Sequence, residues 1–179
     1  MTAELETLKD VVGRLEQAGI DYMLTGSMAL NCYALPRMTR DVDLVVAFVM
    51  RDASRIETVL GEEYYVSQEA ALEAVVNQSS FNAIHQTHLV KADFIIRKRE
   101  EFRLNEFNRR IRLRVADFEA WVVSKEDLIL SKLEWARESQ SQRQLGDVQN
   151  LLATGCDMEY IQAWSAKLNL TDMLIRVSP

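Results

Sequence analysis

Two carboxylates lie two residues apart in a β-rich run at residues 37–46, where Asp41 and Asp43 alternate with Val42 and Leu44. Successive side chains of a strand point to opposite faces, so both carboxylates are expected on one face and the two apolar side chains in a core. Neighbouring carboxylates repel unless a proton or a cation lies between them. Mg²⁺ prefers oxygen ligands and bridges to substrate phosphates, so it meets that need.

A tight turn precedes this run. Residues 22–24 are apolar, Thr25-Gly26-Ser27 interrupts them, and an apolar stretch follows at 28–35. The pattern predicts a strand, a turn, a short helix and then the strand with the two carboxylates. Gly26 lets the backbone approach a ligand closely. Ser27 is expected to cap the helix, whose free N–H groups suit a phosphate.

A third carboxylate belongs to a predicted hairpin formed by residues 80–85 and 89–96. Asp93 lies within Ala-Asp-Phe-Ile-Ile, an apolar strand in which a lone carboxylate would be costly. One interpretation is an edge strand with Asp93 in solvent or paired to Lys91. We favour a central strand that brings Asp93 to the first two carboxylates, because its neighbours are apolar. Three clustered carboxylates should repel, and at least one should then have a raised pKa.

The remaining segments predict an α+β fold. Helices are expected at 3–18, 51–60, 68–76, 100–108, 124–138, 142–152, 157–168 and 170–176, and further strands at 110–115 and 121–123. No strand pattern returns after residue 123. We therefore expect a mixed-sheet core at 1–123 and a C-terminal helical segment at 124–179 packed on it.

Composition limits the class of protein. The chain has 179 residues, of which 48% are hydrophobic and 27% charged, which fits one domain with a helical extension. No apolar stretch approaches the ~20 residues of a membrane span, and the acidic N-terminus lacks the order of a signal peptide. Cys32 and Cys156 are far apart, as expected of buried thiols in a reducing cytoplasm. We expect a cytoplasmic protein with no membrane partner.

The order Gly26-Ser27, then Thr39-x-Asp41-x-Asp43, resembles the signature of the nucleotidyltransferase superfamily, which has the DNA polymerase β-like fold. The stretch GSMALNCYALPRMTRDVDL is similar to the bacterial branch of AbiEii-type and MenT-type toxin enzymes. The resemblance implies transfer of an NMP from an NTP to a hydroxyl of RNA, a tRNA end or a protein, as the toxin of a toxin–antitoxin pair. The alternative is an inactive member that binds a cognate toxin or antitoxin as its regulatory partner.

The resemblance also implies roles for individual residues. It assigns Mg²⁺, with Mn²⁺ as an alternative, to Asp41, Asp43 and Asp93, and makes Asp93 the general base or a ligand of a second metal. It assigns a phosphate-contacting amine to Lys132. Residues expected to contact the nucleotide are Gly26, Ser27, Arg37, Thr39, Arg40, Arg143 and Asp147.

The assignment in the helical segment depends on helix continuity. Lys132, Arg143 and Asp147 would share one face of an unbroken helix, and the toxin-like branch carries a Lys, a later Arg and an Asp. In that branch the Arg more often directly precedes the Asp, where this chain has Gly146. The Ser-Gln-Ser-Gln run at 139–142 can break the helix. The alternative is a surface pair between Arg143 and Asp147, worth about 0.3–0.5 kcal/mol.

The charge of the chain does not identify the molecule that accepts the NMP. The net charge is −6, whereas nucleic-acid binders usually carry a basic surplus. The local surplus could line a nucleotide or RNA groove, or form solvated faces of strands and a helix. It comprises Lys91, Arg97, Lys98, Arg99, Arg103, Arg109, Arg110, Arg112 and Arg114. The sequence does not choose the nucleobase, the acceptor or the oligomeric state.

Overall fold

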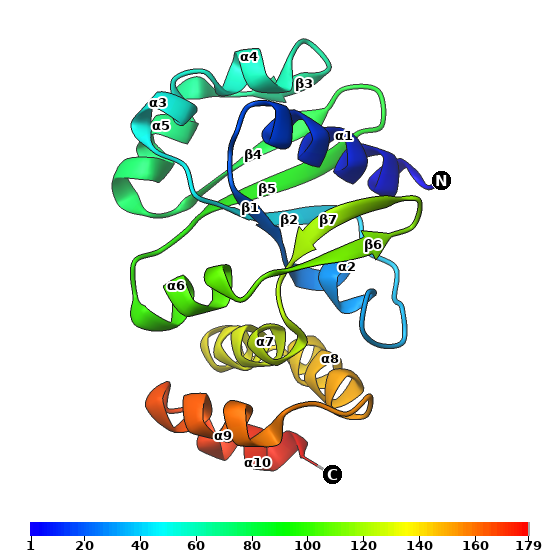
Figure 1. Cartoon of the computed structure of the whole chain (residues 1–179), viewed down its shortest axis with the longest axis vertical. Coiled ribbons are helices and arrows are strands. Elements are labelled where there is room, and N and C mark those ends of the chain that lie inside the picture. The colour runs from blue at the N-terminus through cyan, green and yellow to red at the C-terminus, as the bar shows by residue number, and fades with distance from the viewer. Residues whose placement is uncertain (179) are drawn as a thin grey trace.

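The structure, a computed structural model, describes residues 1–178 as a seven-stranded mixed sheet with helices on both faces (Figure 1). The strand order is β3-β4-β5-β2-β1-β7-β6. The strands are β1 (Tyr22–Leu24), β2 (Asp41–Val46), β3 (Tyr64–Val66), β4 (Ser80–His85), β5 (Val90–Ile96), β6 (Ile111–Val115) and β7 (Phe118–Val122). The predicted α+β class and the mixed sheet are confirmed.

The helices follow the predicted pattern closely. They are α1 (Ala3–Gln17), α2 (Gly26–Leu30), α3 (Met50–Ala53), α4 (Ile56–Leu60), α5 (Gln68–Asn77), α6 (Glu101–Asn108), α7 (Lys125–Ser139), α8 (Gln142–Leu152), α9 (Met158–Lys167) and α10 (Thr171–Val177). The division at residue 123 stays a prediction, and its last residue, 179, lies outside the described residues. None of the helices within residues 1–178 is long and apolar enough to span a membrane.

The centre of the sheet fixes the positions of the three carboxylates. Strand β2 lies between β1, which is antiparallel to it, and β5, which is parallel. The register of β2 and β5 places Asp41 beside Lys91 and Asp43 beside Asp93. Because β5 also pairs with β4, it is a central strand, as the apolar neighbours of Asp93 predicted.

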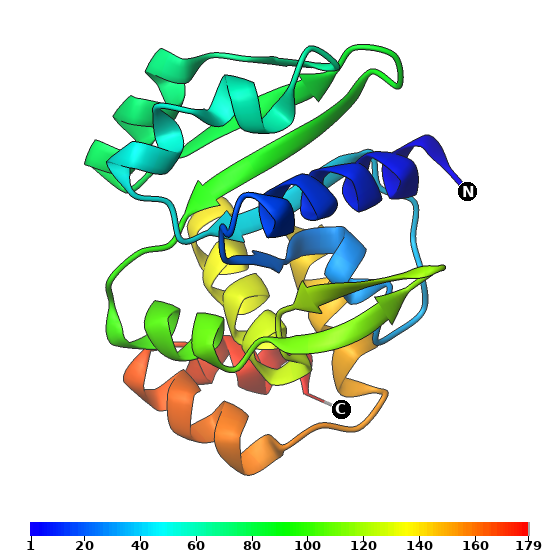
Figure 2. The same cartoon turned by 45° about the horizontal axis from the view of Figure 1, so that its top comes forward.

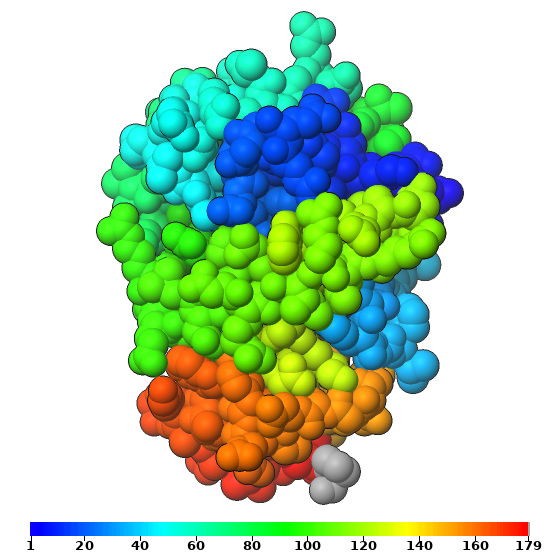
Figure 3. Space-filling model, viewed as in Figure 1, coloured from blue at the N-terminus to red at the C-terminus, as the bar shows by residue number. Residues whose placement is uncertain are grey.

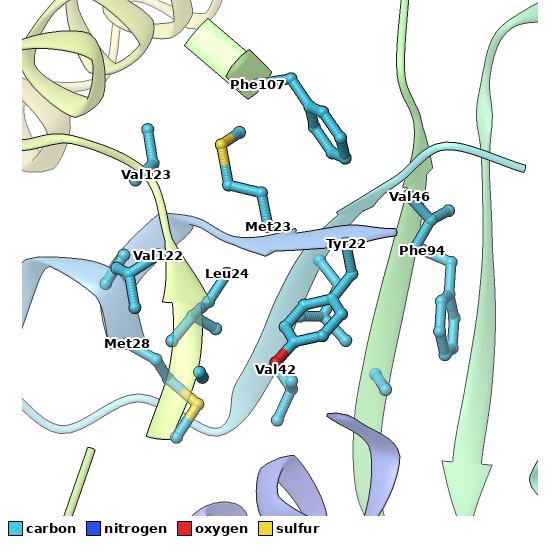
Figure 4. Close-up of a cluster of buried hydrophobic side chains, with 14 of the residues drawn as sticks. Tyr22, Met23, Leu24, Met28, Val42, Val46, Phe94, Phe107, Val122 and Val123 are labelled. Atoms are coloured by element: carbon cyan, nitrogen blue, oxygen red, sulfur yellow. The ribbon is translucent and has the colours of Figure 1, made fainter. Parts of the chain in front are cut away.

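The two faces of β2 have different environments. Val42, Leu44 and Val46 are fully buried, and α1 covers this face of β2 and β5. Tyr22, Val42, Val46 and Phe94 belong to the same apolar cluster (Figure 4). The other face carries the carboxylates and is turned toward α7. The alternation of buried and partly exposed residues along the strand therefore produces both the core and the site.

The helical segment lies against the carboxylate side of the sheet. In Figures 1 and 3, α7 and α8 lie below the strands, and α9 and α10 form the far end of the molecule. Asp127, fully buried, joins these layers. It accepts hydrogen bonds from Ser124 at the start of α7 (2.6 Å), from Arg109 after α6 (3.1 Å) and from the Tyr160 hydroxyl of α9 (2.6 Å). One buried carboxylate thus orients three elements.

Three local predictions were wrong. Residues 51–60 form two short helices, because the backbone leaves helical geometry at Arg55, whose guanidinium donates to Ala18 O. Strand β3 was missed because only three residues pair with β4. Cys32 and Cys156 are free thiols as expected, but they are half-buried.

Candidate active site

Asp43 is the innermost of the three carboxylates. It lies directly beside Asp93 in the register of β2 and β5, whereas the Asp41 side chain, at the start of β2, is 53% exposed. Burial raises the pKa of Asp43 to about 6, and repulsion from Asp93 and Asp41 adds to the rise. Lys132 and Lys91 oppose the shift. The expected repulsion among the carboxylates is therefore found at Asp43.

Gly26 lies against the Asp43 carboxylate. A Cβ atom at this position would be 2.1 Å from Asp43 Oδ2, and the backbone has φ +66°, a left-handed conformation that favours glycine. A backbone hydrogen bond of 2.9 Å from Thr25 N to Asp43 O ties the end of β1 to β2. The Gly-Ser turn and the Asp-x-Asp strand are thus one packed unit, and glycine is required at their contact.

Lys91 lies between the two outer carboxylates. Its Nζ is 2.8 Å from Asp93 Oδ2 and 3.9 Å from Asp41 Oδ1. The hydrogen bond to Asp93 raises the pKa of Lys91 despite partial burial, which keeps the ammonium charged. Among residues 1–178, no three His, Cys, Asp or Glu side chains converge closely enough to hold a metal ion as they stand. The metal-ligand role of the three carboxylates stays a prediction.

Asp147 connects α8 to the turn and to α7. It accepts two hydrogen bonds from the Arg37 guanidinium (both 2.9 Å) and one from Lys132 Nζ (2.8 Å). The same guanidinium donates to Ser27 Oγ at 2.5 Å, and Lys132 donates to Gln144 Oε1 at 3.0 Å. Burial alone would raise the pKa of Asp147, but these donors hold it below its usual value. We call Ser27, Arg37, Lys132, Gln144 and Asp147 the Asp147 network.

Burial has the opposite effect on Lys132. The residue is 2% exposed, and this burial lowers the pKa of its ammonium, although the hydrogen bond to Asp147 opposes the change. Lys132 also lines the cleft that contains Gly26 and Asp43. The amine predicted from the sequence is therefore at the site, held by a neighbouring helix.

Helix α8 reaches this place because α7 ends at Ser139. Gln140 has a left-handed backbone, α8 begins at Gln142, and the two helices lie side by side (Figure 2). The continuous helix required for the predicted face does not form. Asp147 meets Lys132 through this reversal. The neighbour of Lys132 that sequence reasoning missed is Gln144, which is buried, whereas Arg143 is exposed. The signal for Gln144 was its spacing, one turn before Asp147.

The other predicted nucleotide contacts lie further out. Arg143 and Arg40 are exposed, and Thr39 is half-exposed with its hydroxyl 3.5 Å from Asp41 O. Ser27 does not cap α2. The N-cap residue is Thr25, and the Ser27 hydroxyl instead accepts from Arg37. The expected cap fails because the helix begins at Gly26, two residues earlier than a Ser27 cap would require.

A cleft extends from Asp43 and Gly26 along the sheet. Its volume is about 390 Å³, and it runs between the ends of β2 and β5 on one side and α6 and α7 on the other. Apolar side chains include Val45, Ile95, Phe102 and Leu128. Trp135, one turn after Lys132, also lines it and is 52% exposed. The cleft can hold a compact molecule in contact with Asp43.

Polar groups in this cleft are paired with one another. Glu106 is buried, which raises its pKa, and it accepts from Ser131 and from Arg103. Arg103 also pairs with Glu134.

Most of the basic side chains in the predicted local surplus likewise form ion pairs with acidic residues. These are Lys91 with Asp93, Arg109 with Asp127, Arg110 with Asp21, and Arg112 with Glu16 and Glu119. The cleft itself contains two further members of the surplus, Arg97 and Lys98.

The chain has the fold of solved nucleotidyltransferases. It is similar to the antibiotic-resistance factor ANT(2'')-Ia, solved with adenylyl-2''-tobramycin (14% identity, 94% of this chain and 98% of that chain, TM-score 0.58). A solution structure of ANT(2'')-Ia gives 12% identity, 94% and 92% coverage and a TM-score of 0.56. The lincosamide antibiotic adenylyltransferase LnuA, with lincomycin bound, gives 15% identity, 84% and 96% coverage and a TM-score of 0.55. No protein-family model and no curated protein matches the sequence. The AbiEii/MenT branch stays a prediction.

We expect Gly26→Ala to destabilise the protein by about 1–3 kcal/mol, because the new methyl group displaces Asp43 and the backbone is left-handed. Urea unfolding measures the change. Gly13→Ala is the matched control, since nothing lies within 4 Å of a Cβ in that helix. It should be neutral or stabilising by up to about 1 kcal/mol. Equal stability of the two variants would contradict the close contact.

Asp43→Asn should stabilise the metal-free protein at pH 7.5. The folded-state pKa of Asp43 is about 6, above its ordinary 3.8, so the folded state takes up a proton as the pH falls through 6. The ionised carboxylate thus destabilises the fold above that pH, by about 3 kcal/mol at 1.36 kcal/mol per pKa unit. The gain should shrink between pH 7 and 4.5. Unfolding curves across this range measure it, and a gain independent of pH would contradict the assignment.

Proposed function

We propose that this chain is a Mg²⁺-dependent nucleotidyltransferase that moves an NMP from an NTP to a hydroxyl acceptor. The observation that carries the proposal is the pairing of Asp43 with Asp93 beside Gly26, in a cleft that also contains Lys132. Such costly burial of like charges is typical of a functional site. The fold shared with adenylyltransferases supports the same activity.

The donor set suits a divalent cation. Asp41 and Asp43 offer oxygen ligands, and a cation would relieve the repulsion from Asp93 and Asp41 that, after burial, raises the pKa of Asp43. Asp41 and Asp43 would hold Mg²⁺, or Mn²⁺ in its place, and Asp93 is the further carboxylate within reach. When bound, the ion supplies positive charge to the phosphate oxygens.

The protein's own residues would bind and orient the reactants. The backbone N–H groups at Gly26 and the start of α2 would hold the outer phosphates, and Lys132 would supply positive charge to them. Asp93 accepts the proton of the acceptor hydroxyl. The acceptor oxygen then forms its bond to the α-phosphorus as the bond to the bridging oxygen breaks, and pyrophosphate leaves in line. Arg37 acts indirectly, because it positions Ser27 and Asp147.

The acceptor remains to be chosen among an RNA or tRNA end, a protein hydroxyl and a small molecule. The cleft favours a small molecule, because its volume of about 390 Å³ suits a compact ligand. Arg103, Arg109 and Arg110 are paired with carboxylates, so they offer less positive charge to an RNA backbone than their number suggests. Two structural neighbours were solved with adenylyl-2''-tobramycin and with lincomycin, which are small molecules.

Transfer can be measured with each α-labelled NTP, Mg²⁺ and a cell extract, followed by separation of RNA, protein and small molecules. We expect label in one fraction with one preferred NTP. Asp43→Asn should reduce transfer at least 100-fold (on the order of 3 kcal/mol in the barrier), because charge is lost at constant shape. Asp117→Asn, at an exposed carboxylate paired with Lys9, is the control. No wild-type transfer with any NTP would refute the proposal.

The biological role we propose is that of a toxin, with a regulatory or antitoxin partner as the alternative. Both rest on the resemblance of residues 26–44 to toxin enzymes. A toxin should arrest growth when expressed in a bacterial host, and Asp43→Asn should relieve the arrest because catalysis is lost. If the wild type leaves growth unchanged, the toxin role is excluded. If Asp43→Asn arrests growth equally, the protein acts by binding alone.

A further inference from the structure

Lys91 is the one basic side chain placed directly among the three carboxylates in the described residues. Strands β2 and β5 are parallel and in register, so Asp41, Asp43, Lys91 and Asp93 form a four-cornered cluster on one sheet face. Lys91 stands diagonally across from Asp43. Its Nζ donates to Asp93 at 2.8 Å and lies 3.9 Å from Asp41.

The strand register keeps Lys91 on the same face of the sheet as the carboxylates. Lys91 and Asp93 are two residues apart in a central strand, so their side chains share a face in every state in which the sheet is intact. A divalent ion bridging Asp43 and Asp93 would have to approach an ammonium group that already occupies Asp93 Oδ2. Like charges at such separations repel strongly where water is partly excluded.

The charges of the cluster also match a single divalent ion. Three ionised carboxylates and one ammonium carry a net charge of −2. The nearby Lys132 is already held by Asp147. One Mg²⁺ would therefore neutralise the cluster before the triphosphate arrives.

We propose that Lys91 is a built-in cation that takes the place of a second metal ion, so that the site loads one divalent ion, at Asp41 and Asp43. Lys91 then is a positioning residue. It holds the Asp93 carboxylate toward the acceptor hydroxyl and supplies a positive charge that is fixed to the protein. This inference rests on the proposed nucleotidyl transfer and adds to it a metal count and a residue role.

The number of ions can be measured without turnover. Mn²⁺ is titrated into the wild-type protein saturated with a non-hydrolysable NTP, and bound Mn²⁺ is counted by electron paramagnetic resonance. We expect one Mn²⁺ per ternary complex in the wild type and two in Lys91→Met. Two Mn²⁺ ions in the wild type overturn the inference, whether or not the variant folds.

Thermal unfolding in metal-free buffer gives a second readout. Lys91→Met should lower Tm by about 3 °C, because the carboxylates lose the ammonium that is paired with Asp93. Mg²⁺ should restore most of the loss. Lys9→Met is the matched control, since Lys9 also lies 2.8 Å from a carboxylate and is 45% exposed, against 42% for Lys91. Its Tm should respond to Mg²⁺ only as much as the wild-type Tm does.

The two proposals fail in different ways. No metal-dependent nucleotide binding by the wild type would refute the nucleotidyltransferase assignment. Two bound Mn²⁺ ions together with normal transfer would refute only the role of Lys91. An equal Mg²⁺ response of Lys91→Met and Lys9→Met would also refute it, because Lys91 would then be an ordinary surface ion pair.

Discussion

The structure depends on holding like charges together on a rigid sheet. Asp43 and Asp93 are adjacent in register, and each is flanked by apolar residues whose burial on the opposite face fixes the strands. The raised pKa of Asp43 measures the cost of this arrangement. The burial of Val42, Leu44 and Phe94 can offset it, since each fully buried side chain contributes about 1.5–3 kcal/mol. The burial of apolar side chains on one face of β2 and β5 therefore offsets the cost of clustering carboxylates on the other face.

Positive charge is placed around this cluster from three directions. Lys91 comes from the same sheet, Lys132 from α7, and Arg37 from the loop between α2 and β2. Among residues 1–178, Lys91 is the side chain that forms ion pairs with the cluster itself. Lys132 and Arg37 share Asp147, and this holds the Lys132 ammonium close enough to Asp43 to oppose the rise of its pKa. A triphosphate entering the cleft could therefore meet partly compensated lysine and arginine groups whose positions are already fixed, which reduces the entropy cost of binding.

The parts of the site that follow from local pattern were predictable from the sequence. The alternation of Asp41, Val42, Asp43 and Leu44 determines which side chains face the core, and the apolar run around Asp93 determines that its strand is central. The Asp147 network could not be derived in this way. It requires the left-handed Gln140 that turns α8 back along α7, and this reversal brings residues fifteen apart into contact. Arg37 and Asp147, 110 residues apart, meet only in the folded chain. Gln144 was missed and Arg143 misplaced for the same reason, because a break of two residues between helices rotates every later side chain.

The contacts of the clustered basic residues show why amino-acid composition alone is a poor guide to binding partners. Arg109, Arg110 and Arg112 stand close together in the sequence, as in a nucleic-acid-binding segment, but each contacts an acidic residue from a different element. These pairs connect α6 and β6 to α7, α1 and the loop before β1. Arg110 and Arg112 also lie over the Trp121 ring, which adds packing to charge. Their positive charge is thus used to join elements. In the cleft, the exposed Trp135 ring lies one helical turn from Lys132, so an aromatic surface and a buried amine line the same space.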